Sequence, residues 1–223
     1  MATILFDLDG TLVDTAPDLL ATTNAVLSEE GVEPVHRNTL NHLVGQGGRA
    51  MLDRALRTRE RSPSPADLDR MVERFLAVYR EGIPGSSAPF HGVEATLDAL
   101  ATAGHRFAVC TNKFEELSVA LLDALVLRDR FAAVCGPDTF GVRKPDPDHV
   151  LRTIELAGGS RDAAVMVGDS YNDIEAARRA GVPSIGVTFG YTDIPVSELG
   201  ADLVVETFGA ITPEAIERLL DRA

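Results

Sequence analysis

The sequence has only two cysteines, only two lysines and no long apolar run. A membrane-spanning helix needs about 20 consecutive apolar residues, and no stretch of this chain approaches that length. Two cysteines are too few for a disulfide framework, and Cys110 and Cys135 lack the spacing of metal ligands. No charged-then-apolar signal sequence opens the chain. These absences predict a cytoplasmic protein with buried, reduced thiols.

Acidic residues outnumber basic ones. The 223 residues include 34 Asp and Glu against 21 Lys and Arg, which gives a formal charge of −13. Nucleic acids and anionic membranes are polyanions, so this charge predicts that neither is a partner. Apolar residues make up 45% and charged residues 25% of the chain, an ordinary globular composition that argues against disorder. The composition leaves the oligomeric state unknown.

Short apolar runs alternate with stretches of helical spacing over most of the chain. The runs are 2–6, 105–110, 131–135, 163–167, 183–187 and 202–205. Short continuous apolar strands that alternate with helices are typical of a parallel sheet covered on both faces. The sequence therefore predicts an α/β fold with a Rossmann-like parallel-sheet core.

The segment 15–84 interrupts the alternation. It contains no convincing strand, and its pattern indicates several helices, with prolines marking a turn near residue 64. We therefore predict a catalytic core formed by residues 1–14 and 85–223, with a small all-helical cap domain of about four helices inserted at 15–84.

Two carboxylates follow the first apolar run, in the segment Asp7-Leu8-Asp9-Gly10-Thr11. In an extended chain Asp7 and Asp9 point to the same side, at the sheet edge where parallel folds bind ligands. Neighbouring carboxylates repel unless a cation separates them or one is protonated. Such a pair suits a hard metal ion and proton transfer, although a solvated acidic turn would also explain this short motif alone.

Three later strand ends carry groups that suit a phosphate ester. They are Thr111 and Asn112, then Lys144, then Asp169 and Asp173. A helix cap or a solvated loop explains each of them in isolation. However, the only two lysines of the chain, Lys113 and Lys144, both lie beside these groups. Four such segments at successive strand ends predict one active site.

The ordered set of motifs resembles the haloacid dehalogenase-like phosphohydrolases. The motifs are DxDGTLVD at 7–14, TNK at 111–113, KPDP at 144–147 and GDSxxD at 168–173. Within that superfamily the chain resembles phosphoglycolate phosphatases, through DGTLVDTAPDL at 9–19, LVGQGGRAML at 43–52, CTNK at 110–113 and GVTFGY at 186–191. The resemblance implies Mg²⁺-dependent hydrolysis of a small phosphorylated metabolite, with 2-phosphoglycolate as the expected substrate.

The same resemblance implies a role for each site residue. Asp7 would attack phosphorus and form a phospho-aspartyl intermediate, and Asp9 would act as general acid and then general base. The Asp7 carboxylate, the Asp9 carbonyl and Asp169 would hold Mg²⁺. Thr111, the Asn112 amide and Lys144 would bind the phosphoryl oxygens. Asp173 would orient Lys144 or a metal-bound water.

Other reactions of this superfamily fit less well. Dehalogenases typically lack an acid at the position of Asp9, and phosphonate-cleaving relatives use a cap lysine, whereas 15–84 contains none. Hydrolysis of another sugar phosphate or of pyrophosphate stays open, as does a hexose-phosphate mutase. A non-catalytic protein that binds a phosphorylated ligand is disfavoured because Asp7 and Asp9 are both present.

One cap segment, Gly45-Gln46-Gly47-Gly48-Arg49, has the composition of a ligand-binding turn. Backbone N–H groups at glycines approach an anion closely, and a helix start adds partial positive charge. We expect Gly47 and Gly48 to contact the substrate and Arg49 to bind its carboxylate. The alternative is a plain turn between helices with a solvated arginine.

Overall fold

The computed structural model describes residues 1–36, 39, 44–45 and 47–221. Its main sheet has six strands in the order β5-β4-β1-β6-β7-β8, and every neighbouring pair is parallel. The strands are β1 (Thr3–Phe6), β4 (Arg106–Cys110), β5 (Ala133–Cys135), β6 (Ala164–Gly168), β7 (Ser184–Val187) and β8 (Leu203–Val205). The predicted parallel-sheet core is confirmed.

Helices cover both faces of this sheet. They are α5 (Val93–Thr102), α6 (Glu115–Ala124), the short α7 (Pro137–Phe140), α8 (Pro147–Leu156), α9 (Tyr171–Ala180) and α10 (Pro213–Leu220). Along β1, side chains alternate between the faces. Ile4 and Phe6 join the cluster that includes α5 and α10, whereas Leu5 joins the cluster with α8 and α9. This alternation explains why the strand is buried at every position.

The sheet changes its winding direction at β1. The chain leaves β1 for β4 and β5 on one side, then returns to the other side for β6, β7 and β8. Loops that follow neighbouring strands separate at such a point and leave a crevice at the carboxyl edge of the sheet. The segment after β1 therefore lies at the place where this fold class binds its ligands.

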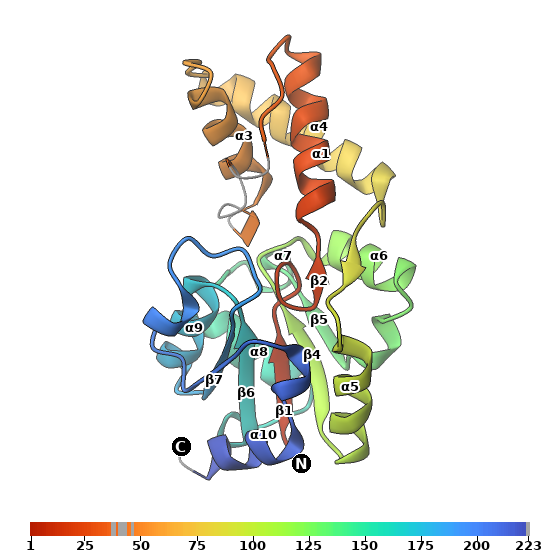
Figure 1. Cartoon of the computed structure of the whole chain (residues 1–223), viewed down its shortest axis with the longest axis vertical. Helices are drawn as coiled ribbons and strands as arrows, with labels where there is room; N and C mark the ends of the chain where they lie inside the picture. The colour runs from red at the N-terminus through yellow and green to blue at the C-terminus, as the bar shows by residue number, and fades with distance from the viewer. Residues whose placement is uncertain (37–38, 40–43, 46, 222–223) are drawn as a thin grey trace.

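Three helices of 15–84 form a second layer above that edge (Figure 1). They are α1 (Ala16–Glu29), α3 (Gly48–Arg57) and α4 (Pro65–Gly82). Their buried side chains, such as Val26, Leu52 and Phe75, form an apolar cluster distinct from those of the sheet. Both termini lie at the opposite end of the sheet (Figure 1). The division at 14/15 and 84/85, and a fourth helix, stay predictions.

Two short crossings join the helical layer to the sheet. β2 (Val13–Asp14) pairs antiparallel with β3 (Ala88–Pro89). Close to this pair, the Asp18 carboxylate accepts hydrogen bonds from the backbone N–H groups of Ser86 and Ser87, at 2.8 and 2.7 Å. The two strands are too short to give a sequence pattern, so the sequence did not predict them.

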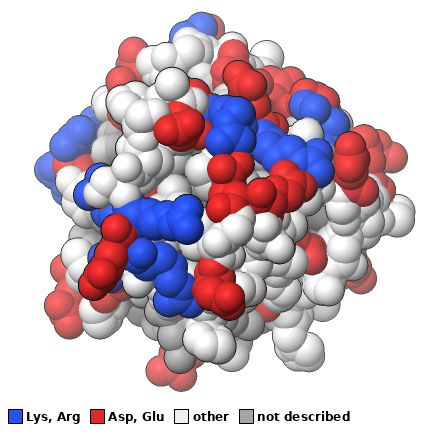
Figure 2. Space-filling model, turned by 90° about the horizontal axis from the view of Figure 1, so that it is seen from above, with Lys and Arg blue, Asp and Glu red and all other residues white. Residues whose placement is uncertain are grey.

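The outer face of the helical layer carries charges of both signs side by side (Figure 2). Arg70 contacts Glu30 at 2.6 Å and Arg74 contacts Glu29 at 2.8 Å, so these exposed pairs join α4 to the end of α1. Exposed pairs of this kind contribute little stability. Within the described ranges, no helix is long and apolar enough to cross a membrane.

Candidate active site

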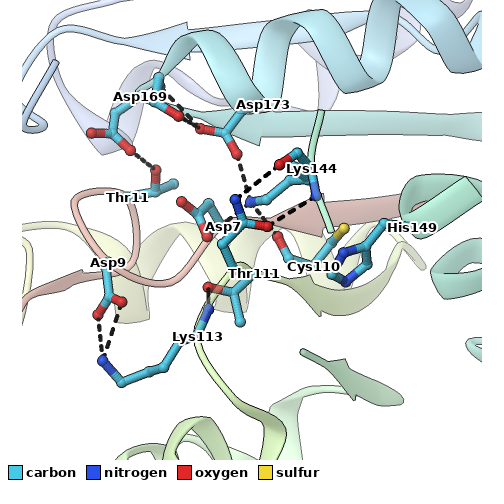
Figure 3. A network of polar contacts seen from close by, with 12 residues as sticks. Asp7, Asp9, Thr11, Cys110, Thr111, Lys113, Lys144, His149, Asp169 and Asp173 are labelled. Atoms are coloured by element: carbon cyan, nitrogen blue, oxygen red, sulfur yellow. Dashed lines mark hydrogen bonds and ion pairs between the residues drawn. The ribbon is translucent and has the colours of Figure 1, made fainter. Parts of the chain in front are cut away.

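Asp7 lies directly beyond the end of β1. Its backbone N–H donates to the carbonyl of Val167 at 2.9 Å, which continues the pairing of β1 with β6 and fixes the carboxylate at the carboxyl edge of the sheet. The side chain is buried, and its Oδ1 lies 2.9 Å from Lys144 Nζ (Figure 3). A buried carboxylate held against a lysine is the main feature of this edge.

Lys144 is 1% exposed and reaches the site from the loop before α8. Its Nζ lies 2.6 Å from Asp173 Oδ1 and donates to the carbonyl of Cys110 at 2.5 Å. The Asn112 side chain donates to the Lys144 carbonyl at 3.0 Å and accepts from the Lys144 N–H at 2.9 Å. Asn112 and Lys144 are thus brought together as predicted from their strand ends, and the Asn112 side chain holds the lysine loop.

Asp7, Asp169 and Asp173 form a buried acidic cluster whose ligand atoms all lie within 4.8 Å of one another. Asp169 accepts a hydrogen bond from the Thr11 hydroxyl at 3.1 Å and from the Tyr191 N–H at 2.7 Å. Asp173 accepts from the Ser170 N–H at 3.0 Å at the start of α9, while its other oxygen faces Lys144. Three predicted site residues therefore converge.

Gly10 makes room for this cluster. It adopts a φ of +87°, and a Cβ atom there would lie 2.6 Å from the Asp169 carboxylate. An L-residue rarely adopts that backbone conformation, and its side chain would also collide with Asp169. The tight turn after β1 therefore requires glycine for two separate reasons.

The cluster holds more negative than positive charge, which changes the protonation of its members. Burial is the main cause that raises the pKa of Asp7 to about 6, against the opposing effect of Lys144. Burial and the nearby Asp173 and Asp7 raise the pKa of Asp169 to about 8. Burial would lower the pKa of Lys144, but Asp173 and Asp7 outweigh it and raise that pKa, so Lys144 stays charged.

Asp9 makes a separate ion pair with Lys113. Both Asp9 oxygens lie 3.1 Å from Lys113 Nζ, and both side chains are almost fully buried. Figure 3 shows the Asp9 carboxylate turned toward Lys113 and away from the cluster around Asp7. The Lys113 ammonium lies 4.4 Å from the ring centroid of Tyr79, in α4. The Asp9 side chain therefore lies outside the three-carboxylate cluster.

A cavity of about 90 Å³ lies between these groups and the helical layer. Its polar side contains Asp7, Asp9, Thr111, Asn112 and Lys113. Its opposite side is mainly apolar and comes from α1, α4 and α6, with Leu19, Phe75, Leu76, Tyr79 and Leu117. The two predicted catalytic aspartates and two of the predicted phosphate-binding residues thus line one small chamber.

The cap glycines line the same cavity, whereas Arg49 does not. Gly45, Gly47 and Gly48 are part of its lining, and Gln46 lies outside the described residues. A Cβ atom on Gly48 would lie 2.6 Å from the Phe75 ring, so close packing of α3 on α4 is itself a reason for glycine there. Contact of Gly47 and Gly48 with substrate stays a prediction.

Arg49 borders a larger, more polar cavity of about 620 Å³, together with Arg143, Asp169 and Tyr191. Its side chain is 51% exposed and contacts Asp69 of α4 at 2.5 Å. The structure therefore gives Arg49 an exposed acidic partner. Its predicted role as a ligand of the substrate carboxylate stays a prediction.

Four residues of the site were not predicted from the sequence. Thr11 and the Tyr191 backbone hold Asp169, Tyr79 covers Lys113, and Lys113 itself pairs with Asp9. The scarcity of lysine drew attention to Lys113 but gave no partner for it. Tyr79 lies 34 residues before Lys113 in the sequence, and no local pattern indicates which face of α4 meets the sheet.

The acidic cluster fits a hard divalent cation. All three side chains supply carboxylate oxygens, the ligand type that Mg²⁺ and Ca²⁺ prefer, and all are buried. Burial, together with the neighbouring carboxylates, raises the pKa values of Asp7 and Asp169, and Lys144 is the one Lys or Arg in contact with this cluster among the described residues. A divalent cation would supply the missing charge.

Comparison with known proteins agrees with this geometry. A family model described as haloacid dehalogenase-like hydrolase matches residues 4–187. The chain belongs to the haloacid dehalogenase-like hydrolases. It is 53% identical to a phosphoglycolate phosphatase of Agrobacterium fabrum, over 98% of this chain and 94% of that protein.

Solved structures extend the comparison. A predicted phosphoglycolate phosphatase from Haemophilus somnus superposes with a TM-score of 0.88 at 29% identity, over 95% of this chain and 96% of that one. CbbY from Rhodobacter sphaeroides, solved in complex with phosphate, superposes with a TM-score of 0.82 at 25% identity, over 97% of this chain and 100% of that one. The family and these relatives make this chain a phosphoric monoester hydrolase that resembles phosphoglycolate phosphatases.

Proposed function

We propose that this enzyme hydrolyses 2-phosphoglycolate in a Mg²⁺-dependent reaction that passes through a phospho-aspartyl intermediate. The observation that carries the proposal is the Asp7 carboxylate, which is buried 2.9 Å from Lys144 beneath a small cavity. The identity to relatives named phosphoglycolate phosphatases supports the choice of substrate.

Asp7 is the nucleophile in this proposal. One of its oxygens attacks phosphorus, the bond from phosphorus to the glycolate oxygen breaks, and an aspartyl phosphate forms. The charged Lys144, aided by Thr111 and the Asn112 backbone N–H, stabilises the negative charge on the phosphoryl oxygens. Asp173 holds Lys144 by the 2.6 Å contact, so it acts as a positioning residue.

Asp9 moves the protons. Once its carboxylate has left Lys113 and taken a proton from solvent, Asp9 gives that proton to the glycolate oxygen as the ester bond breaks. The resulting carboxylate then takes a proton from the water that attacks the aspartyl phosphate. Asp9 has to turn from Lys113 toward the reacting oxygen to do this. Both residues line the same cavity, so the movement is a side-chain rotation within the site.

The Asp7 and Asp169 carboxylates, with the Asp9 carbonyl, would hold Mg²⁺. When bound, the cation would offset the charge of the acidic cluster and favour approach of the anionic phosphate. Asp173 is the third member of the cluster, and because its contact with Lys144, at 2.6 Å, is shorter than that of Asp7, at 2.9 Å, we assign it to holding the lysine. The chain itself supplies the nucleophile, the proton carrier and the lysine.

The size of the cavity supports a small substrate. A single water needs about 10–15 Å³ of such space, so a chamber of about 90 Å³ has room for a two-carbon phosphate ester.

The test is a screen of phosphorylated metabolites with and without Mg²⁺. The panel contains 2-phosphoglycolate, pyrophosphate, glucose 1-phosphate and larger sugar phosphates, with released phosphate as the readout and glucose 6-phosphate assayed to detect mutase activity. We expect the highest kcat/KM for 2-phosphoglycolate, and only with Mg²⁺. A higher kcat/KM for a sugar phosphate or for pyrophosphate would replace the proposed substrate.

A further inference from the structure

We propose that Lys113 is the residue that binds the carboxylate of the substrate and so selects a phosphate ester with a second negative charge. This inference rests on the proposed function, because it concerns the part of 2-phosphoglycolate that is not the phosphate. The structure supplies three observations for it, concerning position, charge and the surroundings of the ammonium group.

The first observation is position. Lys113 follows Thr111 and Asn112 directly, so it lies beside the predicted phosphoryl subsite and lines the same cavity of about 90 Å³. In 2-phosphoglycolate only one methylene carbon and the ester oxygen separate the carboxylate from phosphorus. A carboxylate ligand must therefore lie in the chamber that holds the phosphoryl group. Arg49 lines the other, larger cavity, which Asn112 and Asp169 also border, but its half-exposed side chain is paired with Asp69.

The second observation is charge. Lys113 is the only Lys or Arg among the described residues that line the small cavity. The helices on the opposite side contribute mainly apolar side chains, and an anion without a cationic partner is costly to bury. Lys144 is already in contact with Asp7 and Asp173. A second anionic group that enters this chamber has one cation available, which is Lys113.

The third observation is the present partner of Lys113. The ammonium contacts both oxygens of Asp9 at 3.1 Å, so the site already holds a carboxylate against this lysine. The substrate carboxylate would take the place of Asp9 beside Lys113, or would bind Lys113 together with Asp9. Binding then exchanges one anion for another at this lysine, and no additional unpaired charge is buried. Asp9 then becomes free to turn toward the ester oxygen.

Tyr79 completes the subsite from the helical layer. Its ring lies 4.4 Å from the Lys113 ammonium, and its buried hydroxyl has no hydrogen-bond partner of good geometry among the residues that the structure describes. A tyrosine hydroxyl can donate to a carboxylate. Tyr79 therefore offers a second polar contact at the same end of the cavity.

The experiment compares two substrates that differ in the carboxylate. The substrates are 2-phosphoglycolate and ethyl phosphate, which keeps the two-carbon ester but has no carboxylate. The variants are Lys113→Met, Lys113→Arg and, as a matched control from the other cavity, Arg49→Ala. The readout is the ratio of the two kcat/KM values at saturating Mg²⁺. A general loss of Asp9 function lowers both kcat/KM values by the same factor and therefore leaves their ratio unchanged.

We expect wild-type enzyme to prefer 2-phosphoglycolate strongly and Lys113→Met to reduce that preference by about 30-fold or more, the scale of losing a buried charged partner. Lys113→Arg keeps the charge and should retain most of the preference. Arg49→Ala should change it less than about threefold, as expected for an exposed ion pair. Circular dichroism establishes that each variant folds. If Lys113→Met does not fold, Lys113→Gln takes its place in the same comparison.

The outcomes separate the two proposals. An unchanged preference in a folded Lys113→Met or Lys113→Gln variant would overturn the assignment of Lys113 while leaving the substrate intact. Loss of the preference in Arg49→Ala alone would move the carboxylate site to Arg49. A wild-type enzyme that shows no preference for the carboxylate ester would contradict the proposed substrate, and the Lys113 subsite with it.

Discussion

Lys144 lies 2.9 Å from Asp7 in a part of the molecule where both side chains are buried. The pair lies at the change of winding direction of the sheet, and Asp173 and Asp169 are in the same cluster. The cluster therefore has three carboxylates and one lysine, which contacts two of them. This imbalance of charge leads to the predictions on Asp7, Lys144 and Mg²⁺.

Asp7→Asn should abolish turnover and leave the fold intact. The amide has the shape of the carboxylate but is not an anionic nucleophile, and loss of a nucleophile typically lowers kcat by about 10⁴-fold or more. Because burial already disfavours the Asp7 charge, the metal-free variant should unfold at the same temperature as wild type or higher. Steady-state kinetics and thermal denaturation without Mg²⁺ measure the two effects.

Lys144→Met should destabilise the protein by about 3–5 kcal/mol, the usual effect of removing one partner of a buried ion pair. The loss arises because Asp173 and Asp7 keep their burial but lose their cation. Chemical denaturation gives the free energy of unfolding. The double variant Lys144→Met/Asp173→Asn should recover part of that stability but no activity. If the single variant is as stable as wild type, the ion pairs of Lys144 are not structural.

Stabilisation by Mg²⁺ should increase with pH. The pKa values of Asp7 and Asp169 are raised from 3.8 to about 6 and about 8. In the metal-free protein the protonated carboxyl groups therefore stabilise the folded state fully below about pH 4, and this contribution to the free energy of unfolding is lost as the pH rises toward 8. Mg²⁺ binds the ionised carboxylates. The shift of melting temperature on adding Mg²⁺ should therefore be small at pH 5.5 and large at pH 8.5.

The control for this pH dependence is Asp169→Asn. The amide can still accept from the Tyr191 N–H but cannot ionise, so the Mg²⁺-dependent shift should be much smaller at pH 8.5, and the metal-free variant should be more stable than wild type there. A Mg²⁺ effect of equal size at both pH values would contradict the raised pKa values.

Gly48→Ala should destabilise the helical layer by about 1–3 kcal/mol, the range for overpacking a buried contact. The added methyl would lie 2.6 Å from the Phe75 ring, so α3 and α4 have to separate. Phe75→Leu in the same chain should relieve part of the loss, as thermal denaturation would show. If Gly48→Ala retains full stability but loses activity, the glycine serves the ligand instead of the packing.

The sequence could predict the sheet and the polar groups at its edge because both depend on local patterns. Strands such as 3–6 and 164–168 are mainly apolar and buried throughout, and Asp7 and Asp169 follow them directly. Parallel strands bring their carboxyl ends to one edge, so the convergence of these residues follows from topology alone. The prediction that Cys110 and Cys135 are buried, free thiols is confirmed. It also depended on a local pattern, because both cysteines lie in mainly apolar strands.

The contacts between the helical layer and the sheet could not be predicted in this way. The contact of Tyr79 with Lys113 depends on which face of α4 turns toward the sheet, and the pairing of Lys113 with Asp9 depends on a side-chain rotation. Neither leaves a periodic signal in the sequence. For Arg49 the sequence pattern and the structure differ. The glycine-rich segment around Arg49 suggested a contact with the substrate, whereas the structure places the Arg49 side chain against Asp69.

The most direct test of the proposed mechanism is to trap the phosphate on Asp7. Wild-type enzyme and Asp7→Asn are mixed with labelled 2-phosphoglycolate and Mg²⁺, quenched within milliseconds to seconds, and digested for mass spectrometry. We predict phosphate on the peptide that contains Asp7 in the wild-type enzyme and none on that peptide in Asp7→Asn. Rapid turnover without a modified Asp7 peptide, together with substantial activity of Asp7→Asn, would contradict the mechanism.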